Sequence, residues 1–432
     1  MKFSFKKFIF QNCAIRSQFV ERLYLPFPVM YRNCIFVNLI NLTVPLRTIF
    51  IDEKINIVHG HGSFSTMAQE CMISANMLNL GMVFTEHSLH GFSDLGSFAL
   101  NGIWKLTCGP CDNVLAVSNC QLLNVKHRLS SPDDNTLKFQ TLPNSIYPEL
   151  YKPPEFEHPD AKNTIIVVSR LTGRKGALLM VKTLEQVLNI YREVFLKCQI
   201  EERLEGRGGK CHMRSLLGSN DAIFAISMTF FRNPLYPEIN VIIAGDGPCM
   251  VDVEELRENN HWLDRIQLLG GVHPSEVRKV LGLGRIFLNC SLSEAFCMAI
   301  LEAACAGLHV VTTNVGGIPE VLPDDDQICT LCEPNVNSMV EALMKAVDGV
   351  MTVSDEDFNK RRNKQHKIVK SLYTWEKIAV KIEKIYSEIL EKKKAQGLMI
   401  GERLDRYLKR NYSVIKYSNR VIFEQRNVCK FC

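Results

Sequence analysis

The chain has 432 residues, of which 46% are apolar and 22% charged. These values are ordinary for a globular protein and exclude a disordered, collagen-like or coiled-coil chain, and the length suffices for two domains of roughly 100–200 residues each. The net charge of +5 is too small to indicate a nucleic-acid partner.

Two segments of the N-terminal region bear on targeting and membrane insertion. Met1–Val20 is basic and lacks Asp and Glu, but its apolar run Phe8–Phe10 is too short for a secretory signal. A mitochondrial presequence is a minor alternative. Cys34–Ile51 is the most apolar stretch, yet it contains Asn38 and Arg47, so we expect a buried strand and helix there instead of a span.

Short apolar runs then alternate with helical stretches. We predict strands at Ile55–Val58, Met82–Thr85 and Asn113–Val117, with a helix at Ser65–Leu78. Buried apolar strands separated by helices indicate parallel βαβ units. The proline-rich segment 143–159 indicates an interdomain linker.

The same alternation resumes after the linker. The predicted strands are Thr164–Val168, Val241–Ala244, Ile266–Leu269, Ile286–Asn289 and His309–Thr312, and the predicted helices are Glu294–Ala306, Asn337–Val347 and Trp375–Leu390. Residues 184–233 are too many for a crossover. We interpret about 185–233 as an insertion that begins as an extended helix.

Three cysteine pairs have C-x-x-C spacing, namely Cys108/Cys111, Cys329/Cys332 and Cys429/Cys432. The first is a thioredoxin-type sequence, but it follows a helical stretch, whereas a redox motif needs a helix N-terminus after a strand. A zinc site shared by such widely separated pairs is unlike the zinc-ribbon pattern. Both functions are minor alternatives to a reduced, cytosol-facing protein with incidental thiols.

Chemistry is expected directly after the strands, because ligands of open α/β sheets bind outside the carboxyl ends of the strands. Ser169–Gly176 follows one strand and carries Arg170 and Lys175 beside glycines, which suits a diphosphate. On this segment alone, a solvated basic turn is the favoured alternative. Two later turns allow close approach of backbone to a ligand through Gly245, Gly247, Gly316 and Gly317.

Glu294 and Glu302 stand eight positions apart in a predicted helix, which separates them by about 12 Å along its axis. The two carboxylates of a glycosidase lie ~5–9.5 Å apart. We therefore expect the two residues to bind separate parts of a long ligand, and the helix N-terminus to offer N–H groups to a phosphate. Ordinary surface charge on a helix is the alternative.

Taken together and in this order, these elements resemble the nucleotide-sugar half of glycosyltransferase family 4, whose signature combines an S/G-R-L-x-x-x-K-G loop, a G-(D/E)-G-P turn and E-x7-E. Further segments look like the catalytic subunits of phosphatidylinositol N-acetylglucosaminyltransferase, which start glycosylphosphatidylinositol (GPI) anchor synthesis: His59–Ser65, Phe84–Leu89, Ser291–Ile300 and Gly316–Pro323. The resemblance covers roughly Leu23–Leu184 and Pro234–Leu390.

The resemblance implies an α/β protein with the GT-B fold, two Rossmann-like doubly wound domains facing across a cleft. The expected boundaries are 1–155 for the acceptor-side domain, 156–365 for the nucleotide-sugar domain with its insertion, 366–395 for a crossover helix and 396–432 for a basic tail.

The implied reaction is retaining transfer of N-acetylglucosamine (GlcNAc) from UDP-GlcNAc to phosphatidylinositol. By the resemblance, Arg170 and Lys175 bind the diphosphate, Glu302 binds the ribose, and His87 lies near the transferred sugar. Glu294 holds the sugar hydroxyls and a phosphate with the backbone of the residues that follow it, Ala295, Phe296 and Cys297. No metal or other cofactor is expected, because the two cations do the work of a divalent ion.

Two alternatives concern the histidines. His87 would otherwise be a core or capping residue. His59 and His61 are expected at the same cleft edge, and their spacing also suits a metal site.

The expected partners are UDP-GlcNAc, phosphatidylinositol, the other subunits of the transferase complex and the cytoplasmic face of the endoplasmic reticulum membrane, with no nucleic acid. Residues 391–432 carry eleven Lys and Arg against four Asp and Glu, so the charge excess lies in the tail. Such a tail suits an anionic membrane surface. A plain solvated tail is an equal alternative.

Three features depart from the family. Met1–Val20 has no glycine where relatives carry a Gly-Gly loop, the insertion is long, and Gln396–Cys432 lacks the apolar span of relatives. Two functional alternatives follow: a catalytically impaired form that serves as a non-catalytic subunit, and a family 4 enzyme with another acceptor.

Overall fold

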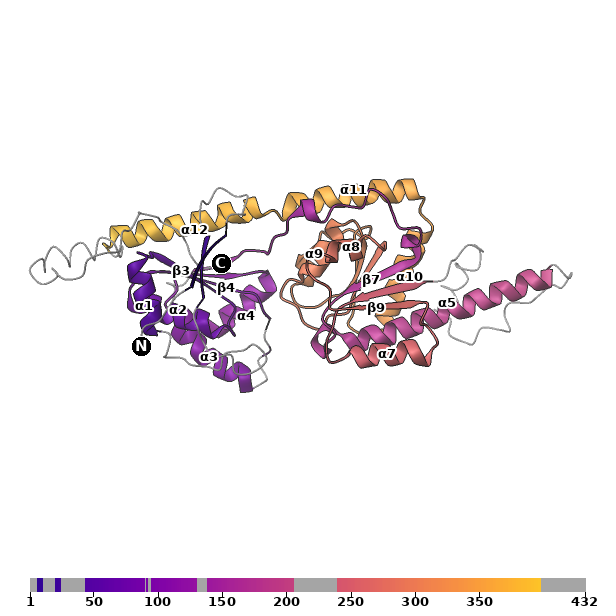
Figure 1. Cartoon of the computed structure of the whole chain (residues 1–432), viewed down its shortest axis with the longest axis horizontal. Coiled ribbons are helices and arrows are strands. Elements are labelled where there is room, and N and C mark those ends of the chain that lie inside the picture. The colour runs from indigo at the N-terminus through magenta and orange to yellow at the C-terminus, as the bar shows by residue number, and fades with distance from the viewer. Residues whose placement is uncertain are drawn as a thin grey trace, which may run out of the picture. The chain divides into compact units, whose positions relative to one another are not determined.

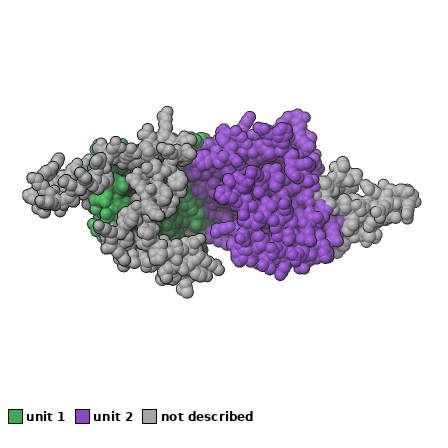
Figure 2. Space-filling view, in the orientation of Figure 1, with its two compact units in different colours: residues 1–143, 376–432 green, residues 144–375 purple. Residues whose placement is uncertain are grey.

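The computed structural model describes residues 6–10, 20–24, 43–89, 91, 95–129, 138–205 and 239–397. The chain divides into two units (Figure 2): unit 1 comprises Met1–Pro143 and Glu376–Cys432, and unit 2 comprises Asn144–Trp375. The division at residue 143 falls at the start of the proline-rich segment. The C-terminal helix returns to unit 1.

Unit 1 contains a parallel sheet of four strands in the order β3-β4-β5-β6 (Figure 1). Their bounds are Ile57–His61, Gly81–Glu86, Asn113–Ala116 and Lys138–Thr141. The predicted parallel βαβ units are confirmed, but the prediction of the first strand at Ile55–Val58 was wrong in its bounds. The strand runs on through His59 and His61, which pair with β4. These four strands follow one another in chain order, without the reversal that a doubly wound sheet has.

Helices cover both faces of this sheet. On one face lie α1 (Thr43–Asp52), α2 (Thr66–Met77), α3 (Leu95–Cys108) and α4 (Asn119–Leu129), whose apolar side chains share a core with Val58 and Phe84. On the other face, Ile378, Ile385 and Ile389 of α12 (Trp375–Ala395) pack on Val83 and Leu115. Because successive side chains of a strand point to opposite faces of the sheet, each strand contributes residues to both cores.

The apolar stretch Cys34–Ile51 ends in α1, as predicted for its helical part; the predicted strand before it lies outside the described residues. Leu46 and Phe50 of this helix are fully buried in the core of unit 1. Within the described ranges, no helix combines the length and the apolar character needed to cross a bilayer. Strands β1 (Lys6–Phe10) and β2 (Val20–Tyr24) form a separate antiparallel pair.

Unit 2 contains a fully parallel sheet of six strands in the order β12-β11-β10-β7-β8-β9. The bounds from β7 to β12 are Thr164–Val168, Asn240–Ala244, Ile266–Gly270, Ile286–Asn289, His309–Thr313 and Cys329–Cys332. All five predicted strands are confirmed, and β12 adds a sixth. The order reverses between β7 and β10, which is the doubly wound topology and places the ligand crevice of such folds at the carboxyl ends of these two strands.

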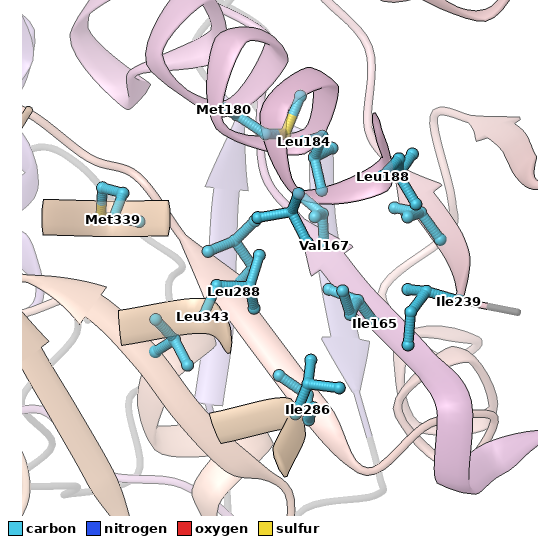
Figure 3. Packing of buried hydrophobic residues seen from close by; sticks show 14 of the residues in the cluster. Ile165, Val167, Met180, Leu184, Leu188, Ile239, Ile286, Leu288, Met339 and Leu343 are labelled. Carbon is cyan, nitrogen blue, oxygen red and sulfur yellow. The ribbon is translucent and has the colours of Figure 1, made fainter. Parts of the chain in front are cut away.

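The core of unit 2 lies between the sheet and three helices, α5 (Ala177–Glu205), α7 (Met250–Asn259) and α10 (Val336–Met351). Figure 3 shows Ile165, Val167, Ile286 and Leu288 of the central strands packed against Leu184 and Leu343 of the helices. Helices α8 (Val277–Leu281) and α9 (Met298–Cys305) contact the strands, and α11 (Asp355–Leu372) packs on α9. The extended helix predicted at the insertion is α5; residues 206–238 lie outside the described part.

Buried ion pairs hold the proline-rich segment against the rest of unit 2. Glu157 accepts hydrogen bonds from Arg285, at 2.9 Å from Nε, and from Arg362, at 3.2 Å from Nη1. Arg362 also donates to the carbonyl of Pro154 at 2.6 Å. The side chains of Arg285 and Arg362 are only 3% and 8% exposed, so both charges depend on Glu157 and on Asp355, which also bonds Arg285.

Candidate active site

The predicted diphosphate and sugar residues of unit 2 meet where the strand order reverses. Lys175 follows β7 and Glu294 follows β10, and the two side chains form a partly buried ion pair although 119 positions separate them in the chain. Arg170 also follows β7, is exposed, and makes no ion pair within the described ranges. One paired and one unpaired cation thus stand at the ligand end of the sheet.

The loop that carries Lys175 is held against β10. It forms the short 3-10 helix Gly173–Lys175 and ends at Gly176 in the left-handed region, at φ +70°. A Cβ atom on Gly176 would lie 1.7 Å from the carbonyl oxygen of Cys290, and the carbonyl of Arg174 accepts a hydrogen bond from Leu292 N–H. Only glycine fits here, and the close approach positions Lys175 beside Glu294.

This geometry predicts the effect of Gly176→Ala. The new methyl group needs both a strained φ and a shift of the Cys290 backbone, so we expect loss of donor binding and destabilisation of unit 2 by more than about 1 kcal/mol. Gly173→Ala in the same loop is the matched control, because a Cβ there meets nothing within 4 Å. UDP titration and urea unfolding of both variants test this, and equal behaviour of the two would contradict it.

The turn Gly245–Pro248 packs on the backbone of the Arg170 loop. A Cβ on Gly245 would lie 1.8 Å from the carbonyl oxygen of Ser169, and one on Gly247 would lie 2.3 Å from that of Leu171. Leu171 N–H donates to the carbonyl of Asp246 at 3.0 Å. These two glycines therefore allow the turn to pack closely on the Arg170 loop, a contact that the sequence did not indicate.

Glu294 lies in a loop, so the prediction of a helix over Glu294–Ala306 was wrong at its start. Helix α9 begins at Met298, after Cys297 in the left-handed region at φ +60°. The spacing of about 12 Å along one helix consequently does not apply. A left-handed cysteine is a strained conformation of the kind that clusters at ligand-binding sites, and burial with the nearby Glu294 charge raises the pKa of its thiol to about 12.

The residues after Glu294 face the site with their backbone groups, because their side chains point into the protein. Ala295, Phe296 and Cys297 are all buried, and the Phe296 ring packs edge-on against Tyr373 at 5.6 Å. The carbonyl of Glu294 accepts a hydrogen bond from Gly317 N–H at 2.9 Å, which brings the Gly316–Gly317 turn to the same loop. This hydrogen bond thus links the two turns that were predicted to bind the donor, one after β10 and one after β11.

Ser291 and Tyr151 are polar partners of the site that sequence reasoning missed. The Ser291 hydroxyl lies 2.9 Å from Glu294 Oε1 and 3.0 Å from Asn289 Oδ1. Tyr151 donates a hydrogen bond to Glu302, and burial raises the pKa of that carboxyl. Ser291 belongs to the strand-end motif S-L-S-E and was recognisable from it, whereas Tyr151 lies in the proline-rich segment, where no pattern marks it.

In unit 1, three histidines gather at the ends of β3 and β4. His61 Nδ1 lies 3.0 Å from His87 Nε2, and the rings of His59 and His61 stack with centroids 4.3 Å apart. Because two ring nitrogens face each other, these rings do not converge on a common point. Within the described residues, no group of three or more His, Cys, Asp or Glu has metal-binding geometry.

Glu86, the neighbour of His87, has a defined role in positioning these loops. It is fully buried, and its carboxylate accepts hydrogen bonds from the backbone N–H groups of Ser63, His87 and Ser88 at 2.7–2.9 Å. A buried carboxylate with three backbone donors fixes the backbone after β3 to the backbone after β4. The histidines at this edge of the sheet are therefore carried by a rigidly held backbone.

The buried His59 and the half-buried His61 predict a pH dependence of stability. Burial and the neighbouring imidazoles lower the pKa of His61 to about 4 and that of His59 well below its usual value. Unfolded histidine binds a proton near pH 6.5, so the unfolded state binds more protons below that pH. Unit 1 should lose up to about 1.4 kcal/mol per pH unit per histidine between pH 6.5 and about 4. Urea unfolding at pH 7.5 and 5.5 tests this, and His61→Asn should flatten the slope.

The structure contradicts a redox role for the Cys108/Cys111 pair. Cys108 ends α3, Cys111 precedes β5, and the two residues are 0% and 5% exposed. Burial, followed by the hydrogen bond and charge of Cys108, raises the pKa of the Cys111 thiol well above its usual value. A redox motif needs an accessible thiol with a lowered pKa.

Comparison with known proteins finds two matching family models. The family model described as PIGA (GPI anchor biosynthesis) matches residues 15–94, and that for glycosyl transferases group 1 matches residues 224–349. A phosphatidylinositol N-acetylglucosaminyltransferase subunit of Arabidopsis thaliana is 36% identical, over 85% of this chain and 69% of its own length. The Homo sapiens protein of the same name is 36% identical, over 89% of this chain and 68% of its own length.

A solved structure supports the fold alone. Sucrose-phosphate synthase from Thermosynechococcus elongatus superposes with a TM-score of 0.58, covering 84% of this chain and 81% of its own, at 16% identity. It is a GT-B glycosyltransferase, so the expected GT-B fold class is confirmed.

Proposed function

Since the chain belongs to the PIGA family of GPI-anchor biosynthesis, we infer that it is a phosphatidylinositol N-acetylglucosaminyltransferase, which moves GlcNAc from UDP-GlcNAc to phosphatidylinositol. The observation that carries this inference is the meeting of Lys175 and Glu294 at the switch point of unit 2, within a chain 36% identical to the named transferases. The roles of individual residues below are our proposals.

Unit 2 holds the donor. The bond between the anomeric carbon of GlcNAc and the β-phosphate oxygen breaks, and its electron pair leaves with UDP. Arg170 and Lys175 stabilise the added charge on that diphosphate. The new bond forms between the anomeric carbon and an inositol oxygen. With retention, the inositol hydroxyl approaches on the face that UDP leaves, so a departing phosphate oxygen is the nearest acceptor for its proton.

Glu294 binds the sugar and does not attack it. Its carboxylate is already engaged by Lys175 and Ser291, and a carboxylate whose charge is so neutralised is a weak nucleophile. It can still accept hydrogen bonds from sugar hydroxyls, while the backbone N–H groups of the residues before α9 face a phosphate. Gly245, Gly247, Gly316 and Gly317 keep these loops in place.

Glu302 binds the ribose. Its half-buried carboxyl already accepts a hydroxyl hydrogen bond from Tyr151, which is the interaction that a ribose hydroxyl would offer. We propose His87 of unit 1 as a contact to the sugar or to the acceptor. No metal or cofactor enters this scheme, because the two cations supply the charge that the leaving group needs.

We further propose that the chain works at the cytoplasmic face of the endoplasmic reticulum membrane with the other subunits of the transferase. The support is the name of the relatives, each of which is one subunit of a transferase, and the basic segment 391–432, which carries a net charge of +7 from eleven basic and four acidic residues. Basic segments gain about 1 kcal/mol per Lys or Arg at anionic membranes.

Complementation tests this function. Cells that lack their own catalytic subunit should regain GPI-anchored proteins at the surface when they express the full chain, and should not when they express Lys175→Ala. Absence of rescue by a chain that assembles and still binds UDP would show a non-catalytic subunit instead. GlcNAc transfer to a different lipid would show another acceptor.

A further inference from the structure

The three histidines of unit 1 form a column of nearly parallel rings. The rings of His59 and His61 are inclined by 22°, and those of His61 and His87 by 20° with centroids 5.3 Å apart. His59 is buried and His87 is exposed, so the column runs from the core to the surface at the carboxyl edge of the sheet. The donor chemistry above makes no use of His59 or His61.

His59 forms the buried end of this column and is held in one orientation. Its Nδ1 lies 2.6 Å from the Tyr386 hydroxyl of α12, and its Nε2 lies 2.7 Å from the Thr85 hydroxyl of β4. With a hydrogen bond at each nitrogen and a side chain only 2% exposed, the ring cannot turn. His61 therefore stacks on a rigid surface.

The hydrogen bond between His61 Nδ1 and His87 Nε2 needs one proton between two nitrogens. The other nitrogen of His61, Nε2, is buried and has no hydrogen-bond partner in the part of the chain that the structure describes. A proton placed there would be a buried, unpaired N–H donor, which proteins avoid more strictly than an unpaired acceptor. The proton of neutral His61 accordingly lies on Nδ1 and is donated to His87.

We propose that His61 is a positioning residue that fixes the tautomer of His87. Because His87 Nε2 accepts this hydrogen bond, neutral His87 carries its own proton on Nδ1. It then meets a ligand oxygen at Nδ1 as a hydrogen-bond donor and not as a base. The ligand chemistry is an oxygen acceptor, either a hydroxyl or a phosphate oxygen of the donor sugar nucleotide or of the inositol lipid. The identity of these two ligands rests on the proposed function.

The same hydrogen bond opposes the protonation of neutral His87. A protonated His87 would turn an Nε2–H group toward the Nδ1–H of His61, so two donors would oppose each other. The titratable groups around the column are His59 on β3, Glu86 on β4, whose carboxylate is bound to backbone N–H groups, and Tyr386 on α12. Removing His61 should therefore make protonation of His87 easier and raise the pH at which it titrates.

The tautomer can be measured directly, without activity. The full chain, labelled with ¹⁵N-histidine and assembled with its partner subunits, is observed in long-range ¹H–¹⁵N spectra, with His87→Gln for assignment. His87 should be protonated at Nδ1 in the wild type and shift toward Nε2–H in His61→Ala. His61→Asn, whose side-chain amide can still donate, should keep the wild-type tautomer. His127→Gln, an exposed histidine on α4 outside the column, should change nothing.

Activity and ligand binding give two further readouts. His61→Ala should lose roughly tenfold in kcat and His61→Asn should recover most of it, as is usual for positioning partners. UDP-GlcNAc and phosphatidylinositol vesicles are added separately, and the one that moves the His87 Nδ1 resonance carries the oxygen. An Nε2–H tautomer in the wild type or a tautomer unaffected by His61→Ala would overturn the proposal. The expected tautomer with a resonance that neither ligand moves would instead overturn the assignment of these two ligands, which rests on the proposed function. Failure of the proposed function alone would leave the tautomer unchanged.

Discussion

Replacing Lys175 by alanine is expected to lower kcat for GlcNAc transfer by about 10²–10³, the usual cost of removing one charge-stabilising donor from an active site. The side chain lies at the switch point beside Glu294, and in the proposed reaction negative charge develops there on the departing diphosphate. The change also leaves Glu294, 8% exposed, without its cation. Steady-state kinetics on the assembled enzyme should show the loss mainly in kcat, because the interaction strengthens as UDP leaves.

Arg174→Ala is the matched control for Lys175→Ala. Arg174 stands next to Lys175 in the same 3-10 helix, but its side chain is exposed and its structural contact is made by the backbone carbonyl. Its activity should stay within about twofold of wild type, as for a surface substitution. Equal losses of activity in both variants would show that Lys175 does not stabilise the leaving group. A Lys175→Ala enzyme whose KM rises while kcat is unchanged would show the same.

Glu157→Ala is expected to destabilise unit 2 by about 3–5 kcal/mol, the cost of breaking a buried ion pair by removing one partner. The substitution leaves Arg285 and Arg362 buried with their shared carboxylate gone. For a unit of this size the loss corresponds to a fall in Tm of about 6–20 °C. The transition of unit 2 should move in thermal and urea unfolding, while that of unit 1 stays where it is.

Glu155→Ala provides the comparison, since Glu155 is exposed two positions earlier in the same segment. Its effect should remain within about 0.5 kcal/mol. If Glu157→Ala behaves like Glu155→Ala, then Asp355 alone satisfies Arg285, and the proline-rich segment is held to unit 2 by other contacts.

The parts of the fold that follow from local pattern were predictable. The strands Thr164–Val168 and Ile286–Asn289 were predicted to the residue, because each is built around a short apolar run, with Thr164 or Asn289 at its end. The rule that ligands bind at the carboxyl ends of strands then assigned Lys175 and Glu294 to one site. Their direct ion pair supports that assignment without having been predicted.

The parts that failed depend on tertiary contacts. Glu294–Cys297 has no strong helix breaker, so it was predicted as the start of a helix. The hydrogen bond from Gly317 and the left-handed Cys297 instead hold Glu294 in a loop. Tyr386 reaches His59 only because α12 returns to unit 1. Neither contact leaves a periodic pattern in the sequence, since each partner lies far along the chain.

The proposed transferase activity is tested most simply with the purified full chain assembled with its partner subunits. The assembly is incubated with UDP-GlcNAc labelled in the sugar and with vesicles that contain phosphatidylinositol, and the lipid product is identified. Label is expected in GlcNAc-phosphatidylinositol, dependent on Lys175 and absent from vesicles that lack the inositol lipid. An assembly that binds UDP yet leaves phosphatidylinositol unlabelled would contradict the proposed activity.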